Sequence, residues 1–520
     1  MANLSAQRAA LLNFPASASL QPAPTPRLSL DTLARLPPSI RRPRFDMAAL
    51  RTGILHLGCG AFHRAHQAVF TQRAMEAEAA AGSGNAPPSW GIVAASLVRP
   101  ASRDRLRPQD GLYTVLERGP DSVRAEVVGT VRGVLYARDD PAGLIARIAD
   151  PSTRIVTLTV TASAYCLDPA TGRLCLDHPG IRGELRDAAR GSAPSSALGF
   201  LVRGLAAVRE AGRRPPVVLS CDNLPANGRT LRRTAMDYAA VFDDSLAEWI
   251  GRSVQFPCTM VDRIVPAVEA ADLADAAAML GLADEAPVST ESFRQWVIED
   301  FEGPRPRWEE AGAEFVADVA PWEASKLRLL NGTHMAIAYL GALQGLRTVA
   351  EVMDDPVFAS YVLRFMLDEQ MPTLPPSGHD IQAYARQLVR RWRNPGIVHQ
   401  LDRVGRNGSD KLQARLLAGL RDNLEAGRPA PCTLLAVAAW VLCHTGPCSP
   451  AMQDPLAERM RRLGGAAGAD MDRLAALVLG MEEVFGTELL RLEAFRTGLS
   501  RAMAALQRKG PRAAAAALLR

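Results

Sequence analysis

The run KLRLLNGTHMAIAYLGAL, residues 326 to 343, has the apolar composition of a buried helix but also carries a lysine, an amide and an imidazole. Glu323 precedes the run, and Lys326, Asn331 and His334 lie within it. At about 100° per residue, Glu323 lies about 60°, His334 about 80° and Asn331 about 140° from Lys326 on a helical wheel. All four side chains therefore fall within one arc and can face one cleft.

A lysine in such a cleft has the chemistry of a general base. Burial disfavours the ammonium form, so the pKa of a buried lysine falls toward neutrality. A neutral amine near pH 7 can take a proton from a substrate. Each residue alone also fits a solvent-facing stripe, with His334 bonded to a backbone carbonyl. The four together favour a site.

Two parts of the chain differ in the spacing of their apolar residues. From Gly53 to about Pro266, β-rich runs such as GILHLGCG and TRIVTLTVT alternate with helix-like segments, which is typical of a doubly wound α/β fold. Beyond about Pro321 the spacing becomes helical. We expect a Rossmann-like α/β domain over residues 27–320 and a mostly α-helical domain over 321–505. Residues 1–26 are expected to be a disordered tail, and 506–520 a frayed one.

The first expected strand ends in HLGCGAFHRAH, which places Gly58 and Gly60 at a strand-to-helix turn. Such a turn lets a dinucleotide pyrophosphate approach the backbone and the next helix. His63 stands where a third glycine is usual. We expect Gly58, Gly60, Ala61 and Phe62 to form a cofactor loop, with Arg64 near a phosphate. A purely steric glycine turn, with Arg64 exposed, is the alternative.

The segment IVAASLVRPASRD supplies the residues that we expect beside the adenosine ribose of the cofactor. An acidic residue there would hold the ribose hydroxyls, but the chain has Val98 and Arg99. Arg99 can accommodate a 2′-phosphate, so NADP stays open beside NAD. A surface arginine explains it equally well.

Composition excludes several classes of protein. The net charge of +5 arises from 60 basic and 55 acidic residues without a dense basic block, which gives no support to nucleic-acid binding. No apolar stretch reaches the roughly 20 residues of a membrane span, and the N-terminus lacks a signal-peptide pattern. The 8 cysteines show no CxxC pair or zinc spacing. We expect a reduced, metal-free, cytoplasmic protein.

Six segments in order resemble the mannitol dehydrogenase family, the polyol-specific long-chain dehydrogenases: HLGCGAFHRAHQ, QDGLYTVLER, SCDNLPANG, MVDRIVPA, QWVIEDF and KLRLLNGTH. The resemblance runs from about Arg27 to beyond Leu412. It implies metal-independent hydride transfer between NAD(H) and C2 of a linear polyol or ketose, with mannitol as the default substrate. It also implies a small-molecule substrate, no nucleic-acid or membrane partner, and a monomer or weak homo-oligomer.

The resemblance also implies roles for single residues. Lys326 would take the alcohol proton, Asn223 and Asn331 would hold the developing alkoxide, and His334 would bond a hydroxyl. Glu323 would connect the lysine with solvent. The expected substrate-binding residues are Asp262, Arg403 and Lys411.

One departure from the family pattern concerns the loop TASAYC. Ala162, Ser163 and Ala164 stand where many relatives carry an acidic residue and a glycine. Two alternatives therefore stay open. One is a hexuronate (fructuronate) reductase in which Arg403 and Lys411 face the carboxylate. The other is a nucleotide-binding sensor without catalysis, which the intact Lys326 disfavours.

Overall fold

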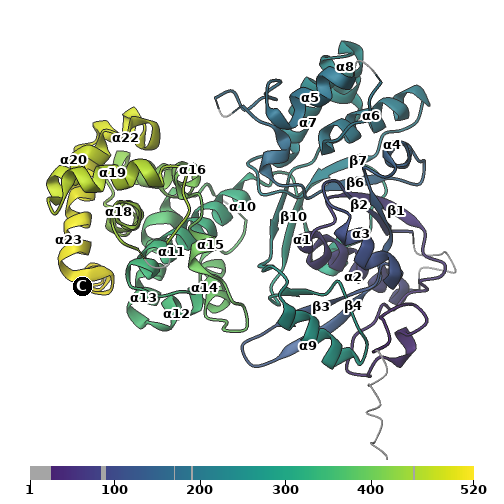
Figure 1. Cartoon of the computed structure of the whole chain (residues 1–520), viewed down its shortest axis with the longest axis horizontal. Coiled ribbons are helices and arrows are strands. Elements are labelled where there is room, and N and C mark those ends of the chain that lie inside the picture. Colours follow the sequence, from purple (N-terminus) through teal and green to yellow (C-terminus); the bar gives the residue numbers. More distant parts are fainter. Residues whose placement is uncertain (1–24, 83–88, 169, 189–190, 377, 449–450) are drawn as a thin grey trace, which may run out of the picture.

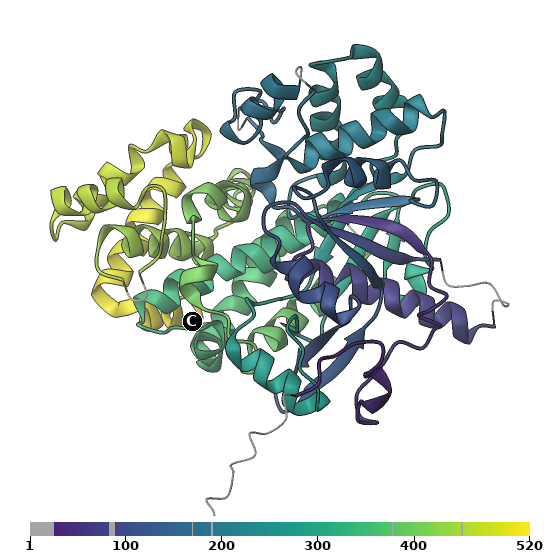
Figure 2. The same cartoon turned by 45° about the vertical axis from the view of Figure 1, so that its right-hand side comes forward.

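The computed structural model describes residues 25–520 apart from 83–88, 169, 189–190, 377 and 449–450. Most of the expected N-terminal tail, residues 1–24, lies outside the described residues. Figure 1 shows an α/β domain beside a helical domain, and Figure 2 shows the same two parts after a 45° turn. The fold class predicted from the sequence is confirmed.

A five-stranded parallel sheet forms the centre of the α/β domain, in the order β5-β2-β1-β6-β7. Its strands are β1 (Thr52–Leu57), β2 (Gly91–Ser96), β5 (Val131–Tyr136), β6 (Ile155–Leu158) and β7 (Val217–Ser220). Alternate residues of β1 enter different cores, Ile54 on one face and Leu55 and Leu57 on the other. The sheet is therefore buried on both faces, which explains why its strands read as continuous apolar runs.

The chain order reverses between β1 and β6, because β2 and β5 lie on one side of β1 while β6 and β7 lie on the other. In doubly wound folds, ligands bind in the crevice at the carboxyl ends of the strands where this reversal occurs. The helices of this domain are α1 (Ala61–Ala65), α2 (Gln67–Ala80), α3 (Ala101–Leu106), α4 (Pro141–Ile148), α5 (Pro179–Ala188), α6 (Ala197–Glu210), α7 (Asn227–Ala240), α8 (Asp244–Ser253) and α9 (Ala270–Leu280).

Two three-stranded sheets accompany the parallel sheet, β4-β3-β9 and β11-β10-β8. Their strands are β3 (Tyr113–Arg118), β4 (Val123–Val128), β8 (Thr259–Asp262), β9 (Val288–Thr290), β10 (Gln295–Glu299) and β11 (Glu314–Val316). Strand alternation alone did not predict these sheets. They matter for the site because β8 ends at Asp262.

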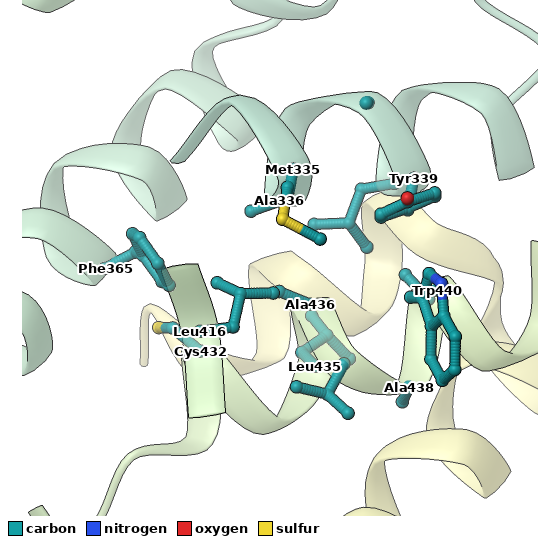
Figure 3. Packing of buried hydrophobic residues seen from close by; sticks show 14 of the residues in the cluster. Met335, Ala336, Tyr339, Phe365, Leu416, Cys432, Leu435, Ala436, Ala438 and Trp440 are labelled. Atoms are coloured by element: carbon teal, nitrogen blue, oxygen red, sulfur yellow. The ribbon is translucent and has the colours of Figure 1, made fainter. Parts of the chain in front are cut away.

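The helical domain is built around α11 and α18, which pack their apolar faces together. Figure 3 shows Met335 and Tyr339 of α11 facing Leu435 and Trp440 of α18. The helices of this domain are α10 (Ala320–Ser325), α11 (Thr333–Leu343), α12 (Val349–Asp354), α13 (Pro356–Arg364), α14 (Ile381–Trp392), α15 (Leu401–Val404), α16 (Gly408–Leu412), α17 (Ala418–Glu425), α18 (Pro431–Thr445), α19 (Ala457–Ala467), α20 (Met471–Leu479), α21 (Glu482–Phe485), α22 (Thr487–Arg491) and α23 (Glu493–Leu518). In the part of the chain that the structure describes, no helix combines the length and apolar character needed to cross a membrane.

The C-terminal segment differs from the frayed tail expected at 506–520. Helix α23 continues to Leu518 with a break at Gly510, and Ala514 and Ala515 are buried in the domain core. The Arg364 guanidinium donates to the Leu518 carbonyl. Alanine has the highest helix propensity and its methyl group fits against a packed helix, so an alanine-rich end forms ordered structure here.

Candidate active site

A cavity of about 630 Å³ lies where the carboxyl ends of the strands meet the helical domain. Its lining includes the glycine turn, the segments that follow β6, β7 and β8, and the helix that carries Lys326. The predicted site residues on its wall are Gly60, Ala61, Phe62, Asn223, Asp262, Lys326, Asn331 and His334. The structure thus brings together residues that are up to 274 positions apart, from Gly60 to His334.

Lys326 is buried in this wall, with 8% of its surface exposed. Its Nζ donates hydrogen bonds to Asn223 Oδ1 at 2.5 Å and to the Val261 carbonyl oxygen at 2.6 Å. Burial lowers the pKa of the amine to about 8, against the attraction of the Asp262 carboxylate. A lysine with this pKa is partly neutral near pH 8 and has the properties of a general base.

The helix around Lys326 is not a uniform α-helix, which corrects the regular wheel assumed from the sequence. Lys326–Gly332 form a π-helix between α10 and α11. Its turns contain more residues than α-helical turns, and such bulges are frequent at functional sites. A Cβ atom on Gly332 would lie 2.6 Å from the Arg415 carbonyl oxygen, so glycine permits the close approach of the neighbouring segment Gln413–Leu417.

His334 is held as a neutral imidazole. Trp392 Nε1 donates to His334 Nε2 at 2.7 Å, and the ring lies edge-on to His399 with centroids 4.9 Å apart. Burial, followed by the charges of neighbouring groups, holds the pKa of His334 well below its usual value. Because Nε2 accepts a hydrogen bond, the proton resides on Nδ1, which leaves His334 one donor for a ligand.

Glu323 lies on the far side of Lys326, in a second cavity of about 250 Å³. Its carboxylate accepts the backbone N–H of Ala226 at 3.0 and 3.2 Å. Burial raises the pKa of this carboxyl group. The two cavities share Lys326, Asn223 and Asn331, so Glu323 and Lys326 both line the second cavity.

Asp262 belongs to a buried cluster of charges that joins the two domains. Arg391 of α14 donates to both Asp262 oxygens, at 2.7 and 2.9 Å, and to both Glu291 oxygens, at 2.8 and 2.7 Å. Tyr384 adds a hydrogen bond to Asp262 at 3.3 Å. Arg391 keeps the pKa of Asp262 below its usual value despite burial. Asp262 is therefore an ionised acceptor on the cavity wall.

The loop TASAYC, which differs from the family pattern, is held by the carboxylate of Asp222, a residue that the sequence did not indicate. Asp222 accepts the backbone N–H of Val160 at 2.9 Å and of Thr161 at 2.8 Å. It also accepts the Tyr165 hydroxyl at 2.9 Å. Ala162 lines the large cavity and brings no charge to it. In the sequence, the only indication of Asp222 is that it directly precedes Asn223 in the SCDN motif.

The glycine turn has the conformation that a nucleotide loop needs. Gly58 has a φ of 101°, and a Cβ atom there would lie 2.1 Å from the Thr159 carbonyl oxygen. Gly60, Ala61 and Phe62 open onto the cavity, whereas Gly58 stands behind them. The positive φ and the close approach of Thr159 require glycine at position 58, which suits both a nucleotide loop and a purely steric turn.

Arg64 does not take the position expected from the sequence. It is buried, donates to the Ala286 carbonyl and lies over the Tyr113 ring at 5.3 Å. It is thus directed into the domain core and not toward a phosphate. Arg99 lies beyond the end of β2 and is exposed, which fits either of its interpretations.

Arg403 and Lys411 line neither of the two cavities. Arg403 is exposed on α15, and the Lys411 amine donates to the Arg406 carbonyl. The structure instead brings Arg391, His399 and Arg415 to the site region. The substrate-binding roles of Arg403 and Lys411 stay predictions, since neither side chain lies on these cavities.

Two family models match the chain. The mannitol dehydrogenase Rossmann domain matches residues 52–310, and the mannitol dehydrogenase C-terminal domain matches residues 318–507. The chain belongs to the mannitol dehydrogenase family. The resemblance found in the sequence is thereby confirmed, and the chain is an oxidoreductase of this family.

Relatives in the mannitol dehydrogenase family carry more than one name. The chain is 38% identical to the D-mannonate oxidoreductase of Escherichia coli (strain K12) over 489 residues, 92% of this chain and 98% of that one. It is 36% identical to the mannitol 2-dehydrogenase of Aspergillus terreus over 474 residues, 89% of this chain and 92% of that one. The Pseudomonas fluorescens mannitol 2-dehydrogenase, solved as a ternary complex with NAD and D-mannitol, superposes with a TM-score of 0.82 at 35% identity, covering 95% and 99% of the chains.

Proposed function

We propose that this family member transfers a hydride between NAD(H) and C2 of a linear polyol or ketose, with Lys326 as the general acid and base. The observation that carries the proposal is the buried Lys326 amine, with its lowered pKa, on the same cavity wall as Asn331 and His334. The solved mannitol 2-dehydrogenase, which holds NAD and D-mannitol, supports the choice of cofactor and substrate class.

The turn from Gly58 to Phe62 would hold the dinucleotide, because Gly60, Ala61 and Phe62 line the cavity at the end of the first strand of the parallel sheet. Bound NAD supplies the acceptor for the hydride. During oxidation, neutral Lys326 takes the proton of the reacting hydroxyl. Asn223 Oδ1 already accepts a hydrogen bond from Lys326 Nζ. Asn223 Nδ2 and the Asn331 amide nitrogen are therefore the donors left for the developing alkoxide.

His334 and Asp262 orient the substrate in this mechanism. The Nδ1–H of His334 donates to a hydroxyl oxygen, while the ionised Asp262 accepts a neighbouring hydroxyl. Glu323, in the second cavity, offers the Lys326 proton a route away from the reacting atoms. Each group is held by packing or hydrogen bonds before the substrate arrives, which is the basis of electrostatic catalysis.

A hexuronate reductase is the second candidate. The identity to D-mannonate oxidoreductase, 38%, is slightly above the 36% to the mannitol 2-dehydrogenase of A. terreus, and the matched segment is longer. The deciding experiment follows NADH formation with D-mannitol, D-sorbitol, D-arabinitol and D-mannonate, and NADH consumption with D-fructuronate. Failure both to oxidise any of the alcohols and to reduce D-fructuronate, by folded protein with either cofactor, would contradict the proposed function.

The preference between the two cofactors depends on Arg99. We expect a higher kcat/KM with NAD, because the solved relative holds NAD, although Arg99 can pair with a 2′-phosphate. The comparison of kcat/KM for NAD and NADP checks this expectation. A preference for NADP that Arg99→Asp reverses would show that Arg99 reads the phosphate.

Activity is expected to persist after treatment with a chelator such as EDTA. Lys326 provides the base, so the proton transfer needs no metal-bound hydroxide. The measurement is the initial rate before and after exhaustive dialysis against EDTA. A loss of activity that added Zn²⁺ restores would contradict a metal-independent mechanism.

A further inference from the structure

A further cavity, of about 610 Å³, lies between the two domains. The α/β domain contributes Phe70 of α2 and the segment 291–294 after β9, and the helical domain contributes residues of α14. None of the described residues lines both this interdomain cavity and the catalytic cavity. Its volume is within the range of about 300–1,000 Å³ that is typical of sites for small molecules. A ligand held here would contact both domains.

Two arginines on the wall of the interdomain cavity have no counter-ion. Among the described residues, neither Arg294 nor Arg390 has an ion-pair partner or a hydrogen-bond acceptor. Arg294 is half-buried, and its Nε is enclosed without a partner while the guanidinium lies over the Phe70 ring at 5.4 Å. An enclosed donor without an acceptor costs free energy and indicates an absent water or ion. Arg294 therefore has donors free for a ligand.

The carboxylate on this wall does not neutralise those two arginines. In the part of the chain that the structure describes, Glu291 is the carboxylate that lines the interdomain cavity. Both of its oxygens accept hydrogen bonds from Arg391, and Oε1 also accepts from Ile264 N. Since Arg391 and Glu291 satisfy each other, the positive charges of Arg294 and Arg390 remain.

A neighbouring cavity of about 520 Å³ also contains arginines and shares Arg294 with the interdomain cavity. Its other cations are closer to neutral balance, because Arg41 binds Glu76 and Arg73 binds Glu126. The interdomain cavity is therefore the stronger candidate for binding an anion.

We propose that the interdomain cavity binds the phosphate group of a small molecule, at a site separate from the catalytic cavity. The planar guanidinium fork of arginine forms charge-assisted hydrogen bonds with phosphate. Arg294 belongs to the α/β domain and Arg390 to α14, and a tetrahedral group can offer oxygens to both. Phe70 and Phe293 give the cavity apolar walls for an organic part of the ligand. The occupant would bind α14 to the α/β domain beside the Arg391 cluster.

Calorimetric titration of the enzyme tests this site, with NADH present to fill the proposed dinucleotide site. The probes are inorganic phosphate and phenyl phosphate, with phenol as the uncharged control. We expect both phosphates to bind and to raise Tm, and phenol to do neither. Tighter binding of phenyl phosphate would identify an organic phosphate as the ligand, and equal affinity would identify the free ion. Either result supports the site.

Arg294→Met and Arg390→Met should each weaken phosphate binding by at least about 10-fold, the effect of a lost hydrogen bond to a charged group. Arg390 is exposed, so its variant should keep the native fold. Arg386→Met is the matched control, because Arg386 is exposed on α14 one turn before Arg390 and does not line the cavity. Arg44→Met removes an arginine that lines the neighbouring cavity alone.

Four outcomes would each overturn the proposal. They are the absence of phosphate binding to the native enzyme, unchanged affinity in Arg390→Met, an equal loss in Arg386→Met, and a loss confined to Arg44→Met. The last would place the anion in the neighbouring cavity. None of these measurements uses turnover, so their result is independent of the proposed hydride transfer.

Discussion

Replacing Lys326 with alanine is expected to lower the rate of substrate oxidation by about 10²–10⁴-fold, the usual contribution of a positioned general base. The effect should appear in kcat, since the proton is transferred in the chemical step. The dissociation constant for NADH should change little, because the glycine turn that would hold the dinucleotide is formed by a different segment. Steady-state kinetics and a fluorescence titration with NADH measure the two quantities.

The chain offers a matched control for this variant. Lys509 is exposed on α23, far along the helical domain from the site, so Lys509→Ala should leave the rate unchanged. Circular dichroism shows whether both variants are folded. A folded Lys326→Ala enzyme that binds NADH and turns over at close to the native rate would show that this amine is not the base.

Replacing Arg391 with methionine is expected to cost about 3–5 kcal/mol in the free energy of unfolding, because Asp262 and Glu291 would both lose their buried partner. The three side chains are no more than 5% exposed and come from different domains. The loss should therefore appear in the unfolding step that separates α14 from the α/β domain. Urea titration monitored by tryptophan fluorescence measures it.

Two further variants test whether the charges are the cause. Arg390 is the exposed neighbour on the same helix, with no ion-pair partner among the described residues, so Arg390→Met should remain within about 0.5 kcal/mol of the native enzyme. Adding Asp262→Asn and Glu291→Gln to Arg391→Met should restore part of the stability, since no unpaired charge is left buried. A loss below about 1 kcal/mol in Arg391→Met, or no recovery in the triple variant, would show that the cluster does not join the domains.

The sequence predicted the parallel sheet, the helical second domain and the convergence of Lys326, Asn331 and His334. These features follow from local patterns, namely apolar runs of strand length and polar residues on one side of an apolar helix. The π-helical turn at Lys326–Gly332 was not predicted, and neither was the close approach of Gly332 to the Arg415 carbonyl, 83 positions away, because no local pattern signals either. The wider turn nevertheless leaves the three side chains on one cavity.

The errors concern side chains whose direction is set by tertiary packing. Arg64 follows the glycine turn as a phosphate-binding residue would. Its guanidinium instead lies in the core, where it donates to the Ala286 carbonyl and stacks over the Tyr113 ring. Arg391 and Glu291 lie 129 and 29 positions from Asp262, and no local pattern connects them. Arg403 and Lys411 line neither cavity, whereas Arg415, one helical turn after Lys411, lines the smaller one.

The pH dependence of kcat/KM for oxidation, measured in the native enzyme and in Lys326→Ala, tests the central role of the lysine most directly. The neighbouring imidazoles stay neutral over this range, because burial holds the pKa of His399 near 4 and that of His334 well below its usual value. In the native enzyme, kcat/KM should rise with pH to a plateau with a midpoint near pH 8, as the Lys326 ammonium loses its proton. In Lys326→Ala that rise should be absent from the residual rate. A variant that keeps the same rise with the same midpoint would contradict the assignment of Lys326 as the general base.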